Sequence, residues 1–453
     1  METELNRVAF KSFWDKFSDK PDTNSMLLNN SAEELAVSDS LDILASLPKV
    51  HNKDVVDIGA GIGRFTTVLA ESAKSVLSTD FIESFILKNQ ERNSHLGNIS
   101  YQVGDAVNLK IADSSVDLVF TNWLMMYLSD SETVEFVAKA MRWLRPHGVI
   151  HLRESCSEPS TGRVQAKSMH NPKDANPTHY RFSSLYINLL RAIRFRDEDN
   201  KLWRFDVHWS CSVPTYITRQ NNWRQVHWLA EKVPAEEGAK ETPFQQLVDL
   251  FSTTWKKTQE EWDNTLNDEE SAWSQSIFDS VLSRSSVAPN GALQNGTKSS
   301  KSLFQKLNVH VWNVETVPEY YRTSLTKANQ RKDQRVRFGW NANLGSSIAY
   351  WQQNGAVFDA LAATELIATS SAHELHSLKN ILAAGADVYT LEHIDEKEEE
   401  NLKKTLTNSG LKLITIADVT DKAVEAQARY CGQYQVKIEN INGGKWVLVH
   451  AKF

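Results

Sequence analysis

The sequence contains little cysteine: only Cys156, Cys211 and Cys431 occur among 453 residues. Three scattered cysteines exclude a disulfide framework, and they lack the paired spacing of a zinc knuckle. The histidines are equally dispersed, and no H-E-x-x-H motif is present. We therefore expect a protein of a reducing compartment with no metal site.

Long apolar runs and an excess of positive charge are absent as well. No apolar stretch approaches bilayer length, and the first residues lack the basic and apolar regions of a signal peptide. The formal net charge is −7 and the pI is about 6.0, which gives no long-range attraction for nucleic acid or an anionic membrane. The sequence therefore predicts a cytoplasmic, monomeric protein whose partners include neither nucleic acid nor a membrane.

The composition, 41% hydrophobic and 24% charged, is that of a globular chain with room for two or three domains. We place the first domain at residues 1–235. Within it, strand-like apolar runs alternate with helical ones, which is typical of a doubly wound parallel sheet. Strands are expected at 55–58, 76–79, 99–103, 116–121 and 149–152. Antiparallel strands that close the sheet edge are expected at 205–211, 214–218 and 223–229.

Helix signals accompany this sheet at two places. Ser129 and Glu132 form a capping box ahead of an apolar-periodic helix. Apolar side chains also recur at helical spacing between residues 5 and 45. These N-terminal helices either pack on the core or form a lid, in which Phe13 and Trp14 close over a ligand.

The second half of the chain predicts another α/β domain. Residues 236–302 combine a helical connector with a segment rich in Ser, Gly, Asn and Lys, which we expect to be a flexible linker. In residues 303–453, strands are expected at 363–369, 387–392, 411–417, 436–439 and 445–451, with helices before residue 384 and at 396–406. No glycine-rich turn follows any of these strands, so we expect a degenerate α/β domain without a cofactor loop.

The segment Asp54–Phe65 joins a buried-strand signal to three glycines and then to an apolar-periodic helix. Glycine lets the backbone turn sharply and lets its amides approach a ligand without a Cβ in the way. The dinucleotide pattern G-x-G-x-x-G needs its third glycine at position 64, but Arg64 stands there and the third glycine is Gly63. The G-x-G-x-G spacing, preceded by Asp57, predicts S-adenosylmethionine as the cofactor.

Residues at the ends of the next strands extend this predicted site. Asp80 ends the second strand, where an acid that binds ribose hydroxyls is expected, although a helix N-cap is an alternative. Asp105 and Ala106 follow the third strand, where they either bind adenine or only form a turn. Trp123 and Tyr127 follow the fourth strand, and ligands bind at such carboxyl ends, so we expect both near the sulfonium. Packing in the core is the alternative for each of these aromatic residues.

Basic and polar residues farther along suit the binding of an anion. Arg153 and Glu154 end the fifth strand, and His179, Tyr180 and Arg181 lie together in the insertion after it. Arginine, histidine and tyrosine supply the fork-shaped and hydroxyl donors that a phosphate monoester needs. A solvated loop has the same composition, so this alternative stays open.

These motifs together resemble the first methyltransferase domain of the phosphoethanolamine N-methyltransferases. The resemblance covers about residues 10–230 and rests on the segments Asp57–Phe65, Asp80–Glu83, Asn122–Asp130, Arg153–Cys156 and Asn176–Arg181. Plant members join two active domains, whereas this chain resembles the nematode enzymes, in which only the N-terminal domain holds a cofactor site. The resemblance implies a class I S-adenosylmethionine-dependent methyltransferase fold, which is Rossmann-like, followed by the degenerate α/β domain.

The resemblance also implies an activity. A methyl group would pass from S-adenosylmethionine to the amine of phosphoethanolamine, giving phosphomonomethylethanolamine and S-adenosylhomocysteine. This is the first step towards phosphocholine and phosphatidylcholine. Two alternatives remain open: a methyltransferase for another small molecule, and an S-adenosylmethionine-binding regulator without catalysis. The number of methyl groups added depends on pocket volume, which the sequence does not give.

The amine must lose its proton before it attacks, so the site needs a base. In single-domain protozoal relatives a Tyr/His pair closes the site, and the histidine position falls on Tyr127 here. Tyr127, His179 and Glu154 are the candidate catalytic residues, with water as the alternative base. The predicted substrate-binding residues are Phe13, Trp14, Tyr127, Arg153, Tyr180, Arg181 and Arg219. The predicted cofactor-binding residues are Asp57, Gly59, Gly61, Gly63, Arg64, Asp80, Phe81, Asp105, Ala106, Asn122 and Trp123.

Overall fold

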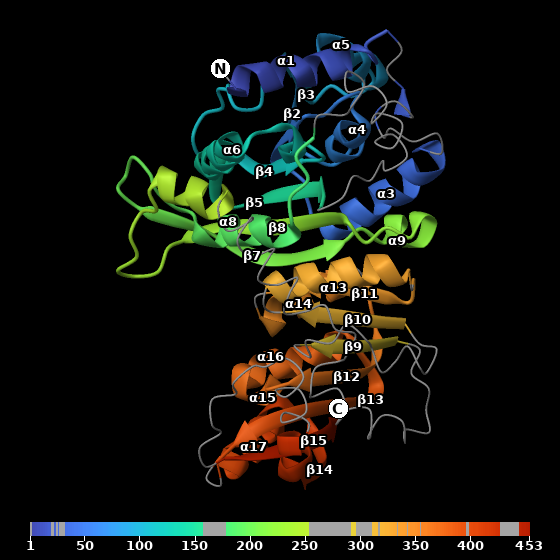
Figure 1. Cartoon of the computed structure of the whole chain (residues 1–453), viewed down its shortest axis with the longest axis vertical. Helices are drawn as coiled ribbons and strands as arrows, with labels where there is room; N and C mark the ends of the chain where they lie inside the picture. Colours follow the sequence, from blue (N-terminus) through green and yellow to red (C-terminus); the bar gives the residue numbers. More distant parts are fainter. Residues whose placement is uncertain are drawn as a thin grey trace. The chain divides into compact units, whose positions relative to one another are not determined.

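The chain divides into two compact units, Met1–Gln259 and Glu260–Phe453 (Figure 1). The computed structural model describes residues 2–19, 22–23, 26, 32–156, 178–252, 291–295, 310–315, 318–332, 334–341, 343–353, 355–395, 398–425 and 444–453. The first unit extends beyond residue 235, because the helical residues 244–252 pack on it. Within that helix, Phe251 is buried with its ring centroid 5.8 Å from that of Tyr186.

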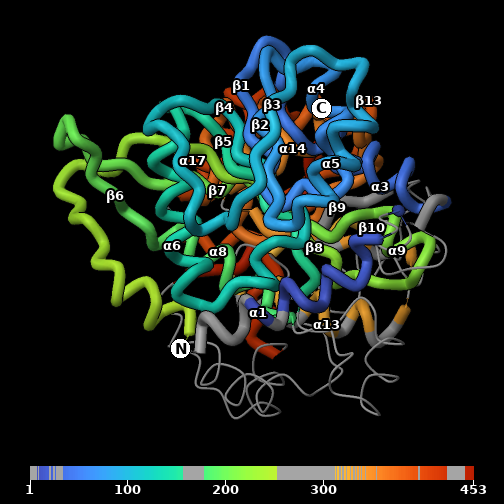
Figure 2. The backbone as a smooth tube through the Cα atoms, turned by 90° about the horizontal axis from the view of Figure 1, so that it is seen from above, coloured from blue at the N-terminus to red at the C-terminus, as the bar shows by residue number. Residues whose placement is uncertain are grey.

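The first unit is built on one mixed sheet. Its strands are β1 (Asp54–Ile58), β2 (Ser75–Asp80), β3 (Ile99–Val103), β4 (Val116–Thr121), β5 (Leu144–Ser155), β6 (Arg194–Arg196), β7 (Leu202–Ser212) and β8 (Gln225–Pro234). Their order is β7-β8-β5-β4-β1-β2-β3, with β6 beside β7. The neighbours from β5 to β3 are parallel and lie side by side in Figure 2, whereas β8 is antiparallel to β5 and β7. The predicted doubly wound sheet with antiparallel closing strands is confirmed.

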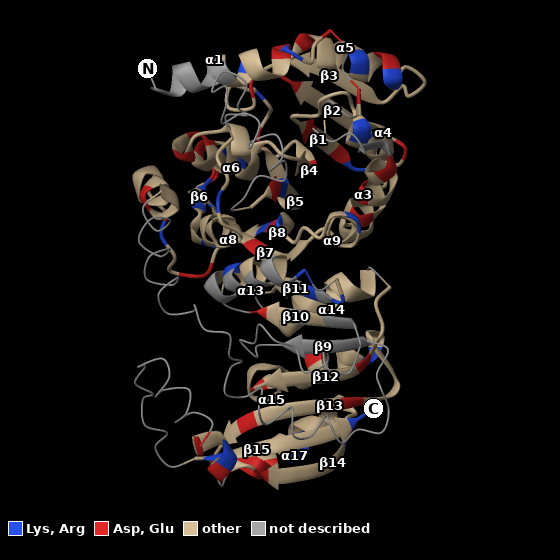
Figure 3. Cartoon of the chain, turned by 45° about the vertical axis from the view of Figure 1, so that its right-hand side comes forward, with Lys and Arg blue, Asp and Glu red and all other residues tan. Residues whose placement is uncertain are grey.

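Helices surround this sheet. They are α1 (Glu2–Asp15), α3 (Ala32–Ser46), α4 (Arg64–Ala70), α5 (Glu83–Arg92), α6 (Asp130–Trp143), α8 (Ser183–Ala192) and α9 (Pro214–Gln220), with the 3-10 turn η1 (Met125–Tyr127). The predicted capping box is confirmed at α6: the Glu132 N–H donates to Ser129 Oγ at 3.3 Å, and the Ser129 N–H donates to the Glu132 carboxylate at 2.9 Å. Both signs of charge occur along α5, so this helix presents no face of one sign (Figure 3).

One predicted strand is wrong, because residues 214–218 belong to the helix α9. Pro214 occupies the first turn, where its fixed φ suits a helix and its missing N–H leaves no bond unmade. The Thr215 N–H donates to Asp42 of α3 at 2.6 Å, and Asn221 ends the helix in the left-handed conformation with φ of 52°. Packing against α3 thus outweighs the strand propensity of the β-branched residues in this segment.

The second unit repeats the strand order of the first. Its strands are β9 (Gly291–Asn295), β10 (His310–Glu315), β11 (Val336–Trp340), β12 (Phe358–Thr364), β13 (Leu382–Ile394), β14 (Lys412–Asp418) and β15 (Lys445–Lys452). The order β14-β15-β13-β12-β9-β10-β11, with β15 antiparallel to both neighbours, matches the first sheet. The helices are α13 (Pro318–Arg331), α14 (Leu344–Gln353), α15 (Leu366–Thr369), α16 (Ala372–Ser377), η3 (Leu378–Asn380) and α17 (Glu398–Ser409).

Two predictions for this half are wrong in part. Residues 291–295, placed in the flexible linker, form β9, because backbone pairing with both β10 and β12 orders a segment of linker-like composition. The strand predicted at 363–369 ends at Thr364, because Glu365 takes a left-handed conformation and α15 follows. Three predicted features lie outside the described residues, namely the strand at 436–439, the helical connector beyond residue 252 and the residues 176–177.

Candidate active site

The glycine segment forms a tight loop between β1 and α4. Gly59, Gly61 and Gly63 all have positive φ, at 72°, 54° and 79°, in a region that other residues rarely adopt. A Cβ on Gly63 would lie 2.0 Å from Asn89 Oδ1, and one on Gly59 would lie 3.2 Å from Leu124 Cδ1. Conformation and close approach both require glycine here, as a ligand cradle at the end of β1 demands.

A buried polar network beneath this loop holds Asp57. The Thr66 hydroxyl donates to Asp57 Oδ2 at 2.6 Å. Asn89 Nδ2 donates to Ser78 Oγ at 2.8 Å and to Thr66 Oγ1 at 3.2 Å. Burial raises the pKa of Asp57 to about 7, although the Thr66 hydroxyl opposes this shift. The network therefore fixes the acid that precedes the glycines.

Asp80 lies at the end of β2 against the glycine loop. Its Oδ2 accepts from the Gly61 N–H at 2.9 Å, and its Oδ1 accepts from the Ile82 N–H at 2.9 Å. Burial raises the pKa of this carboxyl to about 6. The N-cap of α5 is Ile82, so Asp80 is not the cap of that helix. Each carboxylate oxygen of Asp80 can accept a further hydrogen bond, and the binding of ribose hydroxyls stays a prediction.

Two cavities adjoin the loop and share part of their walls. The shared lining residues are Gly59, Asp80, Phe81, Leu124 and Tyr127. Among the other residues that line the first cavity are Trp14, Asp57, Gly61, Arg64, Asn122, Trp123 and Tyr180. Among those that line the second are Val8, Phe10, Lys11, Asp105 and Ala106. The structure therefore brings the predicted cofactor residues together, with Gly63 just behind the walls.

Helix α1 covers both cavities. Trp14 borders the first cavity and Phe10 borders the second. Both rings meet Tyr127 edge-on, with centroids 5.7 and 5.6 Å from that of Tyr127. Residues of α1 thus form part of the walls of both cavities, which is compatible with the predicted lid. Phe13 differs from the prediction, because it is buried against Trp14 and Phe17 and lines neither cavity.

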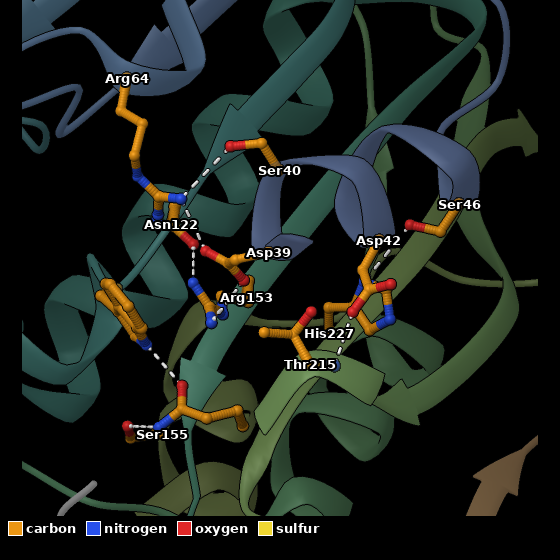
Figure 4. Close-up of polar contacts among 12 residues, drawn as sticks. Asp39, Ser40, Asp42, Ser46, Arg64, Asn122, Arg153, Ser155, Thr215 and His227 are labelled. Atoms are coloured by element: carbon orange, nitrogen blue, oxygen red, sulfur yellow. Dashed lines mark hydrogen bonds and ion pairs between the residues drawn. The ribbon is translucent and has the colours of Figure 1, made fainter. Parts of the chain in front are cut away.

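Arg153 is wholly buried and does not line the first cavity. Figure 4 shows its guanidinium beside Asp39 and Asn122. Its Nη2 donates to Asp39 Oδ1 at 3.1 Å, and its Nη1 donates to Asn122 Oδ1 at 2.7 Å. Its guanidinium lies 3.9 Å from the ring centroid of Trp123. Asp39 also accepts from Arg64 Nη1 at 2.7 Å, so one buried carboxylate of α3 holds both arginines. This corrects the expectation that Arg153 contacts a substrate, because ion pairing and stacking already occupy it.

Glu154 and Arg181 are buried as well, and neither lines the two cavities. The Glu154 carboxylate accepts from backbone N–H groups of the turn that carries Tyr127. Arg181 donates to backbone carbonyls of the same turn. The polar atoms of both side chains are bound to the protein itself, so this geometry gives no support to the predictions of Glu154 as the base and Arg181 as a phosphate ligand.

Comparison with known proteins decides the family. Residues 55–148 match a family model described as a methyltransferase domain. Phosphoethanolamine N-methyltransferase 1 of Caenorhabditis elegans is 61% identical over 455 residues, which cover 98% of this chain and 95% of that protein. The chain belongs to the phosphoethanolamine N-methyltransferase family. The structure of Haemonchus contortus phosphoethanolamine N-methyltransferase 1 with phosphoethanolamine and S-adenosylhomocysteine agrees, at a TM-score of 0.91 and 55% identity over 100% of this chain and 99% of that one.

Two other comparisons show how this chain relates to more distant proteins. Wheat phosphoethanolamine N-methyltransferase 1 is 36% identical over 249 residues, which cover 54% of this chain and 48% of that protein. The structure of Haemonchus contortus phosphoethanolamine N-methyltransferase 2 has a TM-score of 0.59 at 14% identity, over 92% of this chain and 99% of that one. The first likeness spans about half of each chain, and the second shows a shared fold alone.

Two predicted site residues lie away from the walls of both cavities. His179 is exposed, and its backbone N–H donates to Met126 O at 2.7 Å while its ring packs 6.2 Å from that of Phe10. Arg219 is exposed on α9. Neither residue borders the two cavities. Over the described ranges, no His, Cys, Asp and Glu side chains gather into a metal site, and no helix is long and apolar enough to cross a membrane.

Asp39 is a residue of this region that the sequence does not predict. This residue stands on one helical face of α3 with Leu35 and Ile43, four residues to either side, and all three are buried. An acid on an apolar face is rare unless it is paired, so this spacing is a signal that could have revealed it. Thr66 and Asn89 give no such signal, because polar residues are common in helices.

Proposed function

We propose that this chain transfers a methyl group from S-adenosylmethionine to the amine nitrogen of phosphoethanolamine. The products are phosphomonomethylethanolamine and S-adenosylhomocysteine. The observation that carries the proposal is the likeness, over the whole chain, to the Haemonchus enzyme whose structure holds phosphoethanolamine and S-adenosylhomocysteine.

The two cavities support the cofactor part of this proposal. Asp80 borders both cavities, so one elongated ligand can place its ribose there. Asp105 and Ala106 in the second cavity suit the adenine, and Asp57 in the first suits the positive amino group of the methionine part. When bound, S-adenosylmethionine supplies a methyl group on a positively charged sulfonium, an electrophile that needs an aligned amine more than it needs a strong base.

Tyr127 is the one residue of the three catalytic candidates that borders both cavities. Its ring is fixed by the edge-on contacts with Phe10 and Trp14 of the lid. We assign Tyr127 the role of orienting the substrate amine, while water takes the proton.

The test is a product assay with the purified full-length chain. Methyl-labelled S-adenosylmethionine and phosphoethanolamine are incubated with the enzyme, and the phosphobases are identified by mass spectrometry. We expect phosphomonomethylethanolamine. Binding of S-adenosylmethionine without a methylated product would favour the regulator, and methylation of another amine but not of phosphoethanolamine would favour a different small-molecule methyltransferase.

The same assay tests the number of methyl groups added. The sequence contains one G-x-G-x-G segment, so we propose one site and one methyl transfer per substrate. A dimethylated or trimethylated phosphobase would contradict this part. A cytoplasmic location, which the few cysteines suit, belongs to the same proposal and can be checked by cell fractionation.

A further inference from the structure

The turn of residues 124–128 borders both cavities, and its N–H groups meet one buried acid. Glu154 Oε1 accepts from the N–H groups of Leu124 and Met125 at 3.0 and 2.8 Å. Glu154 Oε2 accepts from the N–H of Met126 at 3.2 Å. Because Glu154 is wholly buried, both carboxylate oxygens are committed to the backbone of this turn.

Arg181 holds the opposite side of the same turn. Its Nη1 donates to Met125 O at 2.9 Å, and its Nη2 donates to Leu128 O at 2.7 Å. Its Nε donates to Asp130 Oδ1 at 2.8 Å, and the side chain is only 4% exposed. An anion therefore meets the N–H groups and a cation meets the carbonyls, so charge-assisted hydrogen bonds fix the turn from both sides.

The second unit contains an equivalent turn. Trp123 and Glu365 each follow the fourth strand of their sheets, with left-handed φ of 59° and 54°. The Trp123 N–H donates to Arg153 O at 2.7 Å, and the Glu365 N–H donates to Leu391 O at 2.8 Å. A serine capping box follows each turn after the same interval. The residues after Arg153 and Leu391 therefore correspond, and both are glutamates.

Glu392, the counterpart of Glu154, makes the same kind of contact. Its Oε1 accepts from the Ile367 N–H at 2.8 Å, and its Oε2 accepts from the Ala368 N–H at 3.2 Å. Glu392 is also wholly buried. No G-x-G-x-G segment follows β9 in the sequence, and Thr369 stands where the first unit has Tyr127. Both units thus have this sheet topology and a buried glutamate under the turn, although only the first unit has the glycine loop.

We propose that Glu154 and Arg181 are positioning residues that fix the Tyr127 turn for methyl transfer, and that neither touches the substrate. Glu154 accepts hydrogen bonds from the backbone N–H groups of this turn, a contact that Glu392 repeats in the second unit. The kinetic part of this inference rests on the proposed function, whereas its structural part does not. The two parts therefore need separate measurements.

The first experiment compares Glu154→Gln with Glu154→Asp, because either variant tests the inference if the other fails to fold. Aspartate keeps a base but is too short to reach three N–H groups. We expect both variants to lower kcat on the order of ten-fold or more, with the acid limb of the pH profile retained. Wild-type kcat in Glu154→Asp, or loss of the acid limb in Glu154→Gln, would make Glu154 the base and overturn the inference.

Glu392→Gln is the matched control. It removes the equivalent support from the unit without the glycine loop. We expect it to lower the thermal stability while kcat and the KM for phosphoethanolamine stay at the wild-type values. A loss of kcat equal to that of Glu154→Gln would show that the kinetic effect reports general destabilisation, which would overturn the positioning role.

The second experiment uses Arg181→Gln. We expect kcat to fall and S-adenosylhomocysteine to bind more weakly in calorimetry, because the turn borders both cavities. The KM for phosphoethanolamine should change less than about three-fold, since no phosphate contact is lost. A KM raised on the order of ten-fold or more, with kcat and S-adenosylhomocysteine affinity unchanged, would identify a phosphate ligand and overturn the inference.

Hydrogen exchange separates this inference from the proposed function, because it needs no turnover. The amides of residues 124–126 should exchange faster in both Glu154 variants, and those of residues 367–368 should exchange faster in Glu392→Gln. Wild-type exchange rates at residues 124–126 in Glu154→Gln would refute the structural support. A wild-type enzyme that leaves phosphoethanolamine unmethylated would refute only the proposed function.

Discussion

Asp80 is the residue on which the cofactor site depends most directly. Burial raises its pKa to about 6, so the carboxyl is protonated below that pH and can no longer accept hydrogen bonds from two hydroxyls. We expect the affinity for S-adenosylmethionine to increase as the pH rises through about 6. Calorimetric titrations between pH 5 and 8 would measure this change, and an affinity independent of pH would contradict it.

Asp80→Asn provides the internal comparison. It should weaken binding on the order of ten-fold at pH 8, because hydrogen bonds to a charged acceptor are replaced by weaker ones. The step near pH 6 should disappear, while any step from Asp57, whose pKa is about 7, should remain. A step near pH 6 in the variant would assign the titration to another group.

Gly63 tests the argument that the loop has no room for a side chain. Gly63→Ala places a Cβ 2.0 Å from Asn89 Oδ1 at φ of 79°. Gly238 has the same φ of 79°, but a Cβ there would meet nothing within 4 Å. Gly238→Ala should therefore cost only the conformational strain, about 1–2 kcal/mol. Gly63→Ala should cost about 1–3 kcal/mol more from overpacking, and equal losses in denaturant unfolding would refute the collision.

At the scale of elements, α1 decides how the cavities are closed. Trp14→Ala should raise the KM for phosphoethanolamine and the Kd for S-adenosylmethionine, because it removes a wall of the first cavity and a ring that packs on Tyr127. The expected effect is about three-fold to ten-fold, as for the loss of an aromatic contact of about 1 kcal/mol. Ser12→Ala, at an exposed position of the same helix, is the control and should change neither value.

Elements with local signals are the ones that the sequence predicts correctly. The bounds of β3 and β4 agree with their apolar runs, and the capping box fixes the start of α6. The prediction for residues 214–218 is wrong because their β-branched composition indicates a strand, whereas they form a helix that packs against α3. The strand β9 is not predicted, because its order comes from pairing with β10 and with the more distant β12 rather than from its own composition.

The site residues divide in the same way. Asp57, Asp80, Gly59 and Gly61 border the first cavity, as their positions relative to β1 and β2 predict, while their roles toward the cofactor stay predictions. The surroundings of Arg153 and Arg181 are not predicted, because the sequence shows that a charge is present but not which partner it has. Their partners, Asp39 and the backbone carbonyls of the Tyr127 turn, become visible only in three dimensions.

At the scale of the whole chain, the two units share strand order, the left-handed residue after the fourth strand and a buried glutamate below it. They differ at the end of the first strand, where only the first unit has the G-x-G-x-G segment. The strand order and the buried glutamate that binds the turn therefore occur without the glycine segment that is expected to bind the cofactor. The second unit serves as an internal reference for deciding which buried polar residues belong to the fold and which belong to the reaction.

Buried titratable groups also tie the stability of the first unit to pH. His151 Nε2 lies 3.3 Å from His227 Nδ1, and both side chains are wholly buried. Burial lowers the pKa of His151 to about 3 and that of His227 well below its usual value. Their contribution to stability is therefore present above pH 6.5 and is lost as the pH falls. Asp57, Asp80 and Glu154 have raised pKa values, so their contribution is lost as the pH rises through about 6 to 7.

These opposite contributions largely cancel between pH 4.5 and 6, so a difference measurement is needed to isolate one of them. His151→Gln removes a group that takes up one proton on unfolding below pH 6.5. The free energy of unfolding of this variant, minus that of the wild type, should therefore increase by about 1.4 kcal/mol for each unit by which the pH falls from 6 to 4. Urea unfolding at several pH values would measure this slope, with the exposed His95→Gln as the control. A constant difference across that range would mean that His151 is protonated in the folded protein.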